Sequence, residues 1–316
     1  MQNKQIMPIS GTWFDFHHPN PYEGDYWNST TDQFSAEDWN LKITEMVEAG
    51  MDTLILMSVA LHGKTFYPST VIKERWNLVC PDPLEAVLKA ADHLGVTVYI
   101  GLGFFSTPIF HGFGNEGDAS RYRFEFAHEL AQKYGHHRSF NGWYFPVEAA
   151  IDQYYPEPYI EYVNTLANHC RKIGPQQVLI APFGTRTIVA DDKFVAQLRS
   201  LEADYIAYQD EVGVNKTDVS ELDGIWSRLR EAHDRAGKPL WADVEIFEFH
   251  GKVLFPAPIE RVQKQLEVAS KYVDKILCYQ YLGMLNKPNS KVHAGHPTSP
   301  KLYQDYMDFM QASRQK

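Results

Sequence analysis

The sequence has few cysteines and no cluster of basic residues. Its three cysteines, Cys80, Cys170 and Cys278, are far apart and odd in number, so they indicate neither a disulfide framework nor a metal-binding motif. We expect three buried, reduced thiols. No run of Lys or Arg occurs, and the formal net charge is −10. This charge argues against a nucleic-acid partner.

Long hydrophobic runs are also missing. No apolar segment approaches the roughly 18 residues that a membrane span needs, and residues 1–7 lack the apolar core of a signal peptide. We therefore expect no membrane span. The sequence predicts a cytoplasmic protein, or a periplasmic or secreted one if a leader has been removed, and gives no indication of oligomeric state.

The motifs of several cofactor-dependent and covalent enzymes are absent. Gly101-Leu102-Gly103 lies within an apolar run and lacks the third glycine of a dinucleotide-binding loop. Ser10, Ser58 and Ser106 lack the context of a nucleophile elbow. Lysines avoid the ends of the predicted strands, which argues against a Schiff-base aldolase. We therefore expect no cofactor.

The sequence does contain a regular alternation of short apolar runs and helical segments. The predicted strands are 8–16, 51–59, 96–103, 140–147, 177–184, 204–210, 238–248 and 274–281. The predicted helices are 35–50, 82–94, 119–134, one ending at 173, 191–201, 220–236, 258–272 and 300–310. Ser35 with Asp38 forms a capping-box pattern, and Asp82-Pro83 places a cap before a first-turn proline.

Eight strands alternating with eight helices in 316 residues predict a single (β/α)8 TIM barrel, one catalytic domain over residues 1–316. Near-continuous apolar runs such as 51–59 are typical of parallel strands buried on both faces. A doubly wound open sheet is the alternative, and it would carry a glycine-rich phosphate loop after the first strand. That position holds Trp13-Phe14-Asp15-Phe16-His17-His18 instead, which favours the barrel.

Two glutamates occupy equivalent places at the carboxyl ends of the predicted strands, where TIM barrels have their active sites. Glu148 follows the aromatic run 143–145 after the fourth strand, and Glu245 follows apolar residues in the seventh. Burying an ionised carboxylate is costly unless the group is paired or used. Two facing carboxylates suit glycosidic bond cleavage, because one can protonate the leaving oxygen while the other attacks the anomeric carbon or activates water.

We assign Glu148 as the acid/base, since its apolar neighbours favour the protonated form, and Glu245 as the nucleophile of a retaining enzyme. Retention predicts a carboxyl separation of about 5–5.5 Å, whereas a separation beyond about 6.5 Å indicates inversion. The alternative for each glutamate is an inward structural carboxylate, bonded to a neighbouring tyrosine or arginine.

Asp210, at the end of the sixth strand, is a third catalytic candidate. It could raise the pKa of an acid, bind a sugar hydroxyl or be the true catalytic partner, and its alternative is a loop or helix cap. Glu211 adjoins it and should point the other way if the strand period persists.

Further residues near predicted strand ends are candidates for binding the sugar. Aromatic rings can stack on sugar faces, although each ring taken singly also fits a core. The substrate-binding candidates are Trp13, Asp15, His17, Tyr67, His111, Trp143, Arg186, Glu211, Phe247, Gln280 and Tyr281. Trp241 lies well inside its strand, where we expect it to pack.

Two other functions remain open. His17 with Asp15, Asp210 and Glu245 could bind a metal in a barrel hydrolase or isomerase, but the His-x-His of a first strand and a lysine on the fourth are absent. The remaining histidines form no recognisable metal set, so no metal site is predicted. The second alternative is a carbohydrate-binding barrel without catalysis.

These motifs resemble a known group of enzymes. Glutamates after the fourth and seventh strands are the pattern of the clan of retaining glycoside hydrolases on (β/α)8 barrels, although that clan usually has Asn-Glu where this chain has Val147-Glu148. The sequence is more similar to bacterial barrel families of unknown function grouped beside the glycoside hydrolases. The similar strand-end motifs are Gly11-Thr12-Trp13, Gly142-Trp143-Tyr144 with Glu148, Tyr208-Gln209-Asp210 and Trp241-Ala242-Asp243-Val244-Glu245. The resemblance implies a carbohydrate-active barrel with Glu148, Asp210 and Glu245 in its pocket.

Overall fold

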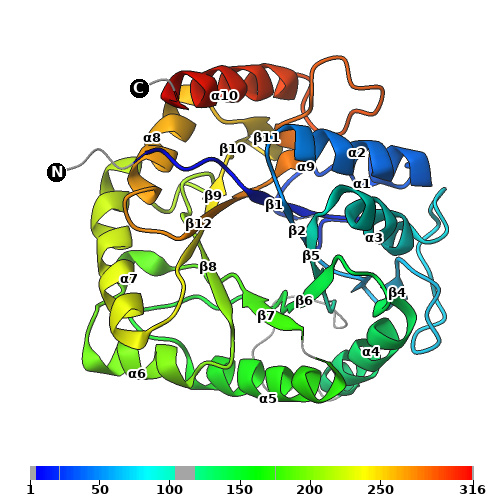
Figure 1. Ribbon diagram of the computed structural model, residues 1–316, viewed down its shortest axis with the longest axis horizontal. Helices are drawn as coiled ribbons and strands as arrows, with labels where there is room; N and C mark the ends of the chain where they lie inside the picture. The colour runs from blue at the N-terminus through cyan, green and yellow to red at the C-terminus, as the bar shows by residue number, and fades with distance from the viewer. Residues whose placement is uncertain (1–4, 21, 104–117, 175, 315–316) are drawn as a thin grey trace.

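Eight parallel strands close into a barrel in the computed structural model, which describes residues 5–20, 22–103, 118–174 and 176–314 (Figure 1). The barrel strands are β1 (Gly11–Phe14), β2 (Thr53–Leu56), β5 (Thr97–Gly101), β6 (Phe140–Tyr144), β7 (Gln177–Ile180), β8 (Tyr205–Gln209), β9 (Trp241–Glu245) and β12 (Lys275–Tyr279). Their order is β1-β12-β9-β8-β7-β6-β5-β2, and β2 closes the ring onto β1. The predicted (β/α)8 fold is confirmed.

A ring of helices surrounds the strands (Figure 1). The main helices are α2 (Ala36–Glu48), α3 (Pro83–Leu94), α4 (Asp118–Tyr134), α5 (Glu157–Ile173), α6 (Asp192–Ser200), α7 (Leu222–Ala236), α8 (Ile259–Ala269) and α10 (Ser299–Arg314). Shorter turns are α1 (Asn28–Thr31), α9 (Tyr281–Met284), η1 (Thr185–Thr187) and η2 (Val219–Glu221). None of the helices in the described ranges combines the length and the apolar character that crossing a bilayer would require.

The predicted helix signals act as expected. The Ser35 hydroxyl accepts the Asp38 backbone N–H, while the Asp38 side chain accepts the Ser35 N–H, so both halves of the capping box form. The Asp82 carboxylate caps α3 by accepting the Glu85 N–H at 3.0 Å. These contacts satisfy amide donors that have no partner within the helix.

Two hairpins at the carboxyl ends of barrel strands were not expected from the sequence. One joins β3 (Ala60–Leu61) to β4 (Lys64–Thr65), and the other joins β10 (Phe247–His250) to β11 (Val253–Pro256). The predicted seventh strand, 238–248, therefore spans parts of two strands. Barrel pairing ends at Glu245 opposite Tyr279, and Phe247 pairs instead with Pro256 across the hairpin. Apolar character continues across this change of direction, which is why the sequence reads as one run.

The lower part of the barrel is filled by aromatic side chains. Trp241 stacks on Tyr205 with ring centroids 4.2 Å apart, and it meets Tyr99 edge-on at 6.4 Å. Since β9 and β5 are not neighbours in the sheet, the contact between Trp241 and Tyr99 spans the barrel interior. Trp241 is thus a packing residue, and the interior here is a packed core and not a channel.

Replacement of Trp241 tests whether this packing stabilises the fold. Trp241→Ala removes a side chain that is only 7% exposed, and we expect it to lower the free energy of unfolding by about 3–5 kcal/mol, because a large core cavity forms. Denaturant titration measures this change. Tyr22→Ala, at a side chain that is 83% exposed, is the control, and equal stability losses in the two variants would contradict the packing.

Candidate functional site

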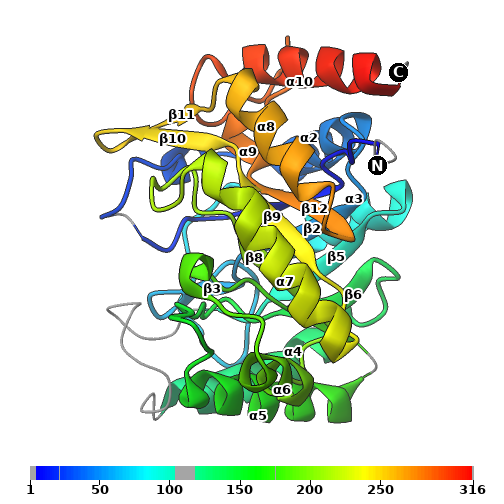
Figure 2. The ribbon, with the colours of Figure 1, turned by 90° about the vertical axis from the view of Figure 1, so that its left-hand side faces the viewer.

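Acidic residues lie at the carboxyl end of the barrel. This is the side on which the β10–β11 hairpin and β3 project (Figure 2). Each of these residues follows or ends a different strand, so the closed ring brings them together although they are far apart in the sequence. Asp15 follows β1, Glu148 follows β6, Asp210 follows β8, and Glu245 ends β9. We call these four residues, with Asp243 of β9, the carboxylate group.

Glu245 is held by the loop that follows β8. Its side chain is buried, and its Oε2 accepts the Val214 backbone N–H at 2.9 Å. A Cβ atom at Gly213 would lie 2.9 Å from the same oxygen, so a glycine is needed there to let the backbone approach the carboxylate. Burial raises the pKa of Glu245 to about 8, and the negative charges of Asp210 and Glu211 add to the rise.

Asp210 lies between β8, β9 and α8. Its Oδ1 accepts the backbone N–H groups of Val212 and Glu245, each at 3.2 Å, and its Oδ2 accepts the Gln265 side-chain amide at 2.7 Å. Burial raises the pKa of Asp210 to about 6, against these hydrogen bonds and the charge of Arg261, which lower it. Asp210 thus fixes the backbone of Glu245. Its negative charge also contributes more to the raised pKa of Glu245 than any other charge does.

Glu148 lies four residues beyond the end of β6, which is separated from β8 by β7. Its Oε1 accepts the Tyr144 hydroxyl at 2.9 Å, which is the tyrosine partner that the structural alternative expects. Burial raises the pKa of Glu148 to about 7, with smaller contributions from the charges of Glu23 and Asp15, while hydrogen bonds from Gln209 and Tyr144 oppose the rise. Such a group can donate a proton near neutral pH.

Asp15 comes together with Gln280, as the sequence predicts for residues at neighbouring strand ends. Its Oδ2 accepts the Tyr279 hydroxyl at 2.5 Å and the Gln280 side-chain amide at 2.9 Å. Within the described ranges, Asp15 Oδ1 and Gln280 Oε1 are buried without a hydrogen-bond partner. Burial raises the pKa of Asp15 to about 6. Two unpaired acceptors beside each other suit a ligand that donates hydrogen bonds, such as a hydroxyl group.

Asp243 is a member of the group that the sequence analysis missed. It is two residues before Glu245 on the same strand, so both side chains point into the barrel. Its Oδ1 has no hydrogen-bond partner in the described part of the chain. Burial holds the pKa of Asp243 well above its ordinary value, and the charges of Glu245, Asp210 and Glu148 add to this effect. The sequence did carry a signal for it, because Trp241, Asp243 and Glu245 alternate along β9 and therefore share one face of the strand.

Tyr26 was also missed, because it belongs to the loop after β1. Its ring stacks on His18 with centroids 3.3 Å apart, and its hydroxyl donates to Glu23 Oε2 at 3.3 Å. Burial raises the pKa of the Tyr26 hydroxyl, and the charges of Glu23, Asp15 and Glu245 raise it further. The loop therefore folds back toward the carboxylate group, which a local pattern cannot indicate.

Two predicted aromatic residues border the carboxylate group. Trp13 lies below it in the barrel interior, edge-on to Tyr144 at 6.0 Å, and its Nε1–H has no partner in the described ranges. Phe247 meets the Tyr279 ring edge-on at 5.9 Å. Because Tyr279 contacts Asp15, Phe247 is next to the acidic residues.

Three other predicted binding residues lie in the packing between the strands and the helices. Tyr67 is fully buried and donates to Glu129 of α4 at 2.6 Å. Trp143 is fully buried and alternates with the inward Tyr144, so it faces the helices. Tyr281 is fully buried and stacks on Phe14. The structure does not bring these three rings to the carboxylate group.

The remaining predicted residues bind neighbouring protein groups. His17 contacts Asp32 at 2.5 Å and packs against Trp76, not against the carboxylate group. Arg186 is exposed and donates to Glu221 at 2.8 Å. Glu211 Oε2 accepts the Gly184 and Thr185 N–H groups at 2.7 and 3.3 Å, so it caps η1. His111 lies outside the described residues.

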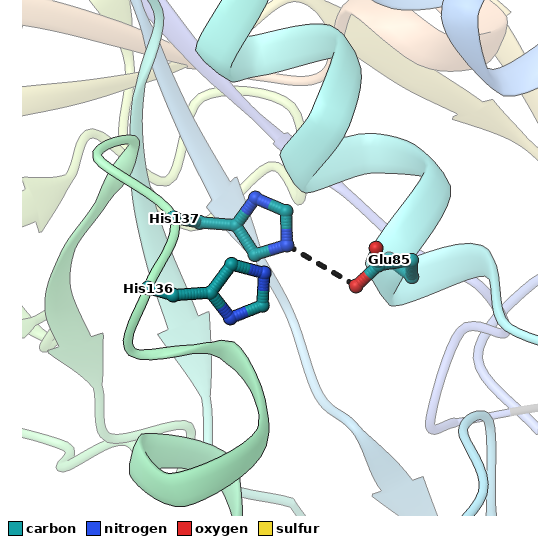
Figure 3. Close-up of side chains that lie close together, drawn as sticks. All are labelled: Glu85, His136 and His137. Carbon is teal, nitrogen blue, oxygen red and sulfur yellow. Dashed lines mark hydrogen bonds and ion pairs between the residues drawn. The ribbon is translucent and has the colours of Figure 1, made fainter.

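One set of donor atoms that could hold a metal ion lies elsewhere. Glu85 of α3 and the adjacent His136 and His137 place one ligand atom each within 4.8 Å of one another (Figure 3). No local pattern indicates this set, because Glu85 is about 50 residues from the two histidines. The alternative metal group of His17 with Asp15, Asp210 and Glu245 is a different set, and His17 is turned to Asp32.

Comparison with solved structures connects this barrel to glycoside hydrolases. A protein of Bacteroides thetaiotaomicron VPI-5482, provisionally assigned as an alpha-L-fucosidase, is 19% identical with a TM-score of 0.78, over 98% of this chain and 94% of that one. The endo-beta-1,4-mannanase of Thermotoga petrophila is 10% identical with a TM-score of 0.61, over 98% and 77%. The GH99 endo-alpha-mannosidase of Bacteroides thetaiotaomicron is 10% identical with a TM-score of 0.53, over 97% and 98%.

At these identities the likeness shows a shared fold. No curated protein matches the sequence. A family model does match, over residues 9–292, which is most of the chain. The predicted resemblance to barrels of the glycoside hydrolase type and to a family without known function is therefore confirmed. The chain belongs to the family described as domain of unknown function DUF4434.

Proposed function

We propose that this chain is a glycoside hydrolase that cleaves a glycosidic bond in an oligo- or polysaccharide, with Glu148 and Glu245 as its catalytic pair. The observation that carries the proposal is the electrostatic pairing at the barrel mouth. Two glutamates at the ends of non-adjacent strands both have a pKa raised toward or above neutrality, and both act on the same buried Asp243. Raised carboxyl pKa values at a strand end are typical of catalytic acids.

In the proposed mechanism Glu148 is the acid/base. Its proton passes to the departing glycosidic oxygen, while the Tyr144 hydroxyl holds Oε1 and the Gln209 side chain also bonds to the carboxyl group. In the second half of the reaction the same carboxylate takes a proton from water. Its pKa of about 7 suits both roles, because a group that gives and takes a proton works best when its pKa is near the working pH.

Glu245 is the proposed nucleophile. The Val214 N–H fixes its Oε2, and the carboxylate would attack the anomeric carbon to form the glycosyl-enzyme intermediate as the glycosidic oxygen departs. Asp210 is a positioning residue in this account, because it binds the Glu245 backbone N–H and not the sugar. Asp15, Gln280 and Tyr26 are proposed to bind sugar hydroxyl groups.

The raised pKa of Glu245 leaves a second assignment of the two roles open. Burial and the charge of Asp210 both raise that pKa, so Glu245 can also hold the proton that the reaction needs. With the roles exchanged, Glu245 would be the acid and Glu148 the nucleophile. Both assignments keep the same two residues and the same reaction.

Replacement of either glutamate tests the pair. We expect Glu148→Gln and Glu245→Gln to lower kcat by about 10²–10⁴-fold or more, because each removes a proton-transfer or nucleophilic group. A panel of aryl glycosides and polysaccharides supplies the substrates. The matched control is Glu129→Gln, a buried glutamate that also accepts a tyrosine hydroxyl, from Tyr67, and lies outside the carboxylate group.

A loss of activity in Glu129→Gln as large as that in the two other variants would contradict the assignment. Binding of sugars by the wild-type protein, without cleavage of any glycoside, would instead support a carbohydrate-binding barrel. Azide separates the two role assignments, since it replaces a missing nucleophile with inversion of the anomeric centre and a missing acid/base with retention. We expect the inverted glycosyl azide from Glu245→Ala.

The pKa values also predict the pH dependence. Catalysis needs one glutamate ionised and the other protonated. Below about pH 7 the ionised member gains a proton, and above about pH 8 the protonated member loses one. We expect a bell-shaped kcat/KM profile with its maximum between these values, whichever glutamate is the acid.

Asp210→Asn tests whether the charge of Asp210 sets the alkaline limb of the kcat/KM profile. Since the charge of Asp210 raises the pKa of Glu245, its removal should move the alkaline limb to lower pH. Asp218→Asn, at an exposed aspartate that caps η2, is the control and should leave the profile unchanged. An alkaline limb that stays in place in Asp210→Asn would refute the coupling, provided that the melting temperature shows a folded variant.

A further inference from the structure

The second group of chemical interest lies at the opposite end of the barrel from the carboxylate group. His136 and His137 belong to the segment 135–139 that leads into β6. They are therefore at the amino end of that strand. The segment packs on α3, where the Asp92 carboxylate accepts the Ser139 N–H at 2.7 Å and the Leu88 carbonyl accepts the Ser139 hydroxyl at 3.2 Å.

His137 is held between two carboxylates of α3. It is 5% exposed, its Nδ1 is 2.7 Å from Asp92 Oδ2, and its Nε2 is 3.1 Å from Glu85 Oε2. A neutral imidazole carries only one N–H. If that hydrogen is on Nδ1 and bonds to Asp92, the lone pair of Nε2 faces an oxygen lone pair of Glu85. Two acceptors at this distance repel each other unless a proton or a metal cation lies between them.

The surrounding groups favour a metal cation. Carboxylate–histidine–metal chains, in which an acid holds one ring nitrogen and the other binds the ion, are the usual arrangement around protein-bound zinc. Asp92 is in the place of that acid. Lys89 bonds to Glu85 Oε1 at 2.9 Å, so it occupies the other oxygen and leaves Oε2 turned to His137.

His136 supplies a third ligand atom. Its ring centroid is 4.2 Å from that of His137, and the three ligand atoms lie within 4.8 Å of one another (Figure 3). Zinc bonds of about 2.0–2.2 Å in a tetrahedron place ligand atoms roughly 3.3 Å apart. The distance between Nε2 of His137 and Oε2 of Glu85 already has that length. His136 is exposed, so its side chain can turn to complete the set.

We propose that Glu85, His136 and His137 form a zinc-binding site, with Asp92 orienting His137 and a solvent molecule completing the coordination. The ion joins segment 135–139 to α3 on the outer surface of the barrel. The role is structural, because the site is at the amino end of β6 and shares no residue with the carboxylate group. It is independent of the proposed glycosidase activity.

Zinc titration of the full chain, freed of metal beforehand, tests this site. Calorimetry on the wild type should give one zinc ion per chain, and zinc should raise the melting temperature, because binding to the folded state stabilises it. His136→Ala should weaken zinc binding by about tenfold or more and remove the rise in melting temperature. Because His136 is exposed, this variant should melt like the wild type when no metal is present. Glu85→Gln should weaken binding similarly.

The control variant is His250→Ala. His250 is also exposed, and it is 2.8 Å from the Glu248 carboxylate, but this pair has one imidazole and not two. The His250→Ala variant should bind zinc like the wild type. Absence of zinc binding in the wild type would overturn the proposal, as would equal losses in His136→Ala and His250→Ala. Neither result depends on hydrolysis of a glycoside, so failure here is distinct from failure of the proposed function.

Discussion

The cost of burying carboxyl groups is the constraint on which the arrangement of the barrel mouth depends. Moving an ionised carboxylate out of water costs several kcal/mol unless hydrogen bonds or opposite charges compensate. The hydrogen bonds that compensate this cost differ from one carboxyl group to the next. Asp210 receives three N–H donors, and Asp15 receives a hydroxyl and an amide. Asp243 Oδ1 has no hydrogen-bond partner in the described part of the chain, and burial holds the pKa of Asp243 well above its ordinary value.

The same constraint explains the loops. Gly213 lets the backbone approach Glu245, and the Val214 N–H then bonds to that carboxylate. Glu211 is buried, and its carboxylate is compensated by the Gly184 and Thr185 N–H groups. The aromatic floor made by Trp241, Tyr205 and Tyr99 closes the barrel below these groups. Water is thereby excluded on one side, and the raised pKa values of Glu148 and Glu245 follow from this burial.

The sequence was sufficient for the fold and for most of the residues at the barrel mouth, for a physical reason. Apolar runs and helix caps are local, and a closed ring of parallel strands brings residues at strand ends together, so Asp15, Asp210, Glu245 and Gln280 could be placed. Strand position alone does not give side-chain direction, which is why Trp143 and Tyr281 lie in the outer packing. Tyr26 depends on a loop that folds back, and the group of Glu85, His136 and His137 depends on contacts between distant segments. Asp243 could have been found by applying the two-residue period of β9.

The central claim is that Glu245 and Glu148 share one reaction, with Glu245 forming the bond to the sugar. A panel of 2-deoxy-2-fluoro glycosides with good leaving groups tests this most directly, because such sugars trap the glycosyl-enzyme intermediate of retaining enzymes. Mass spectrometry of the digested protein then locates the added sugar. The account predicts one sugar per chain on the peptide that contains Glu245, and no label in Glu245→Gln. A label on Glu148 or Asp210, or a product of inverted configuration from a cleaved substrate, would contradict it.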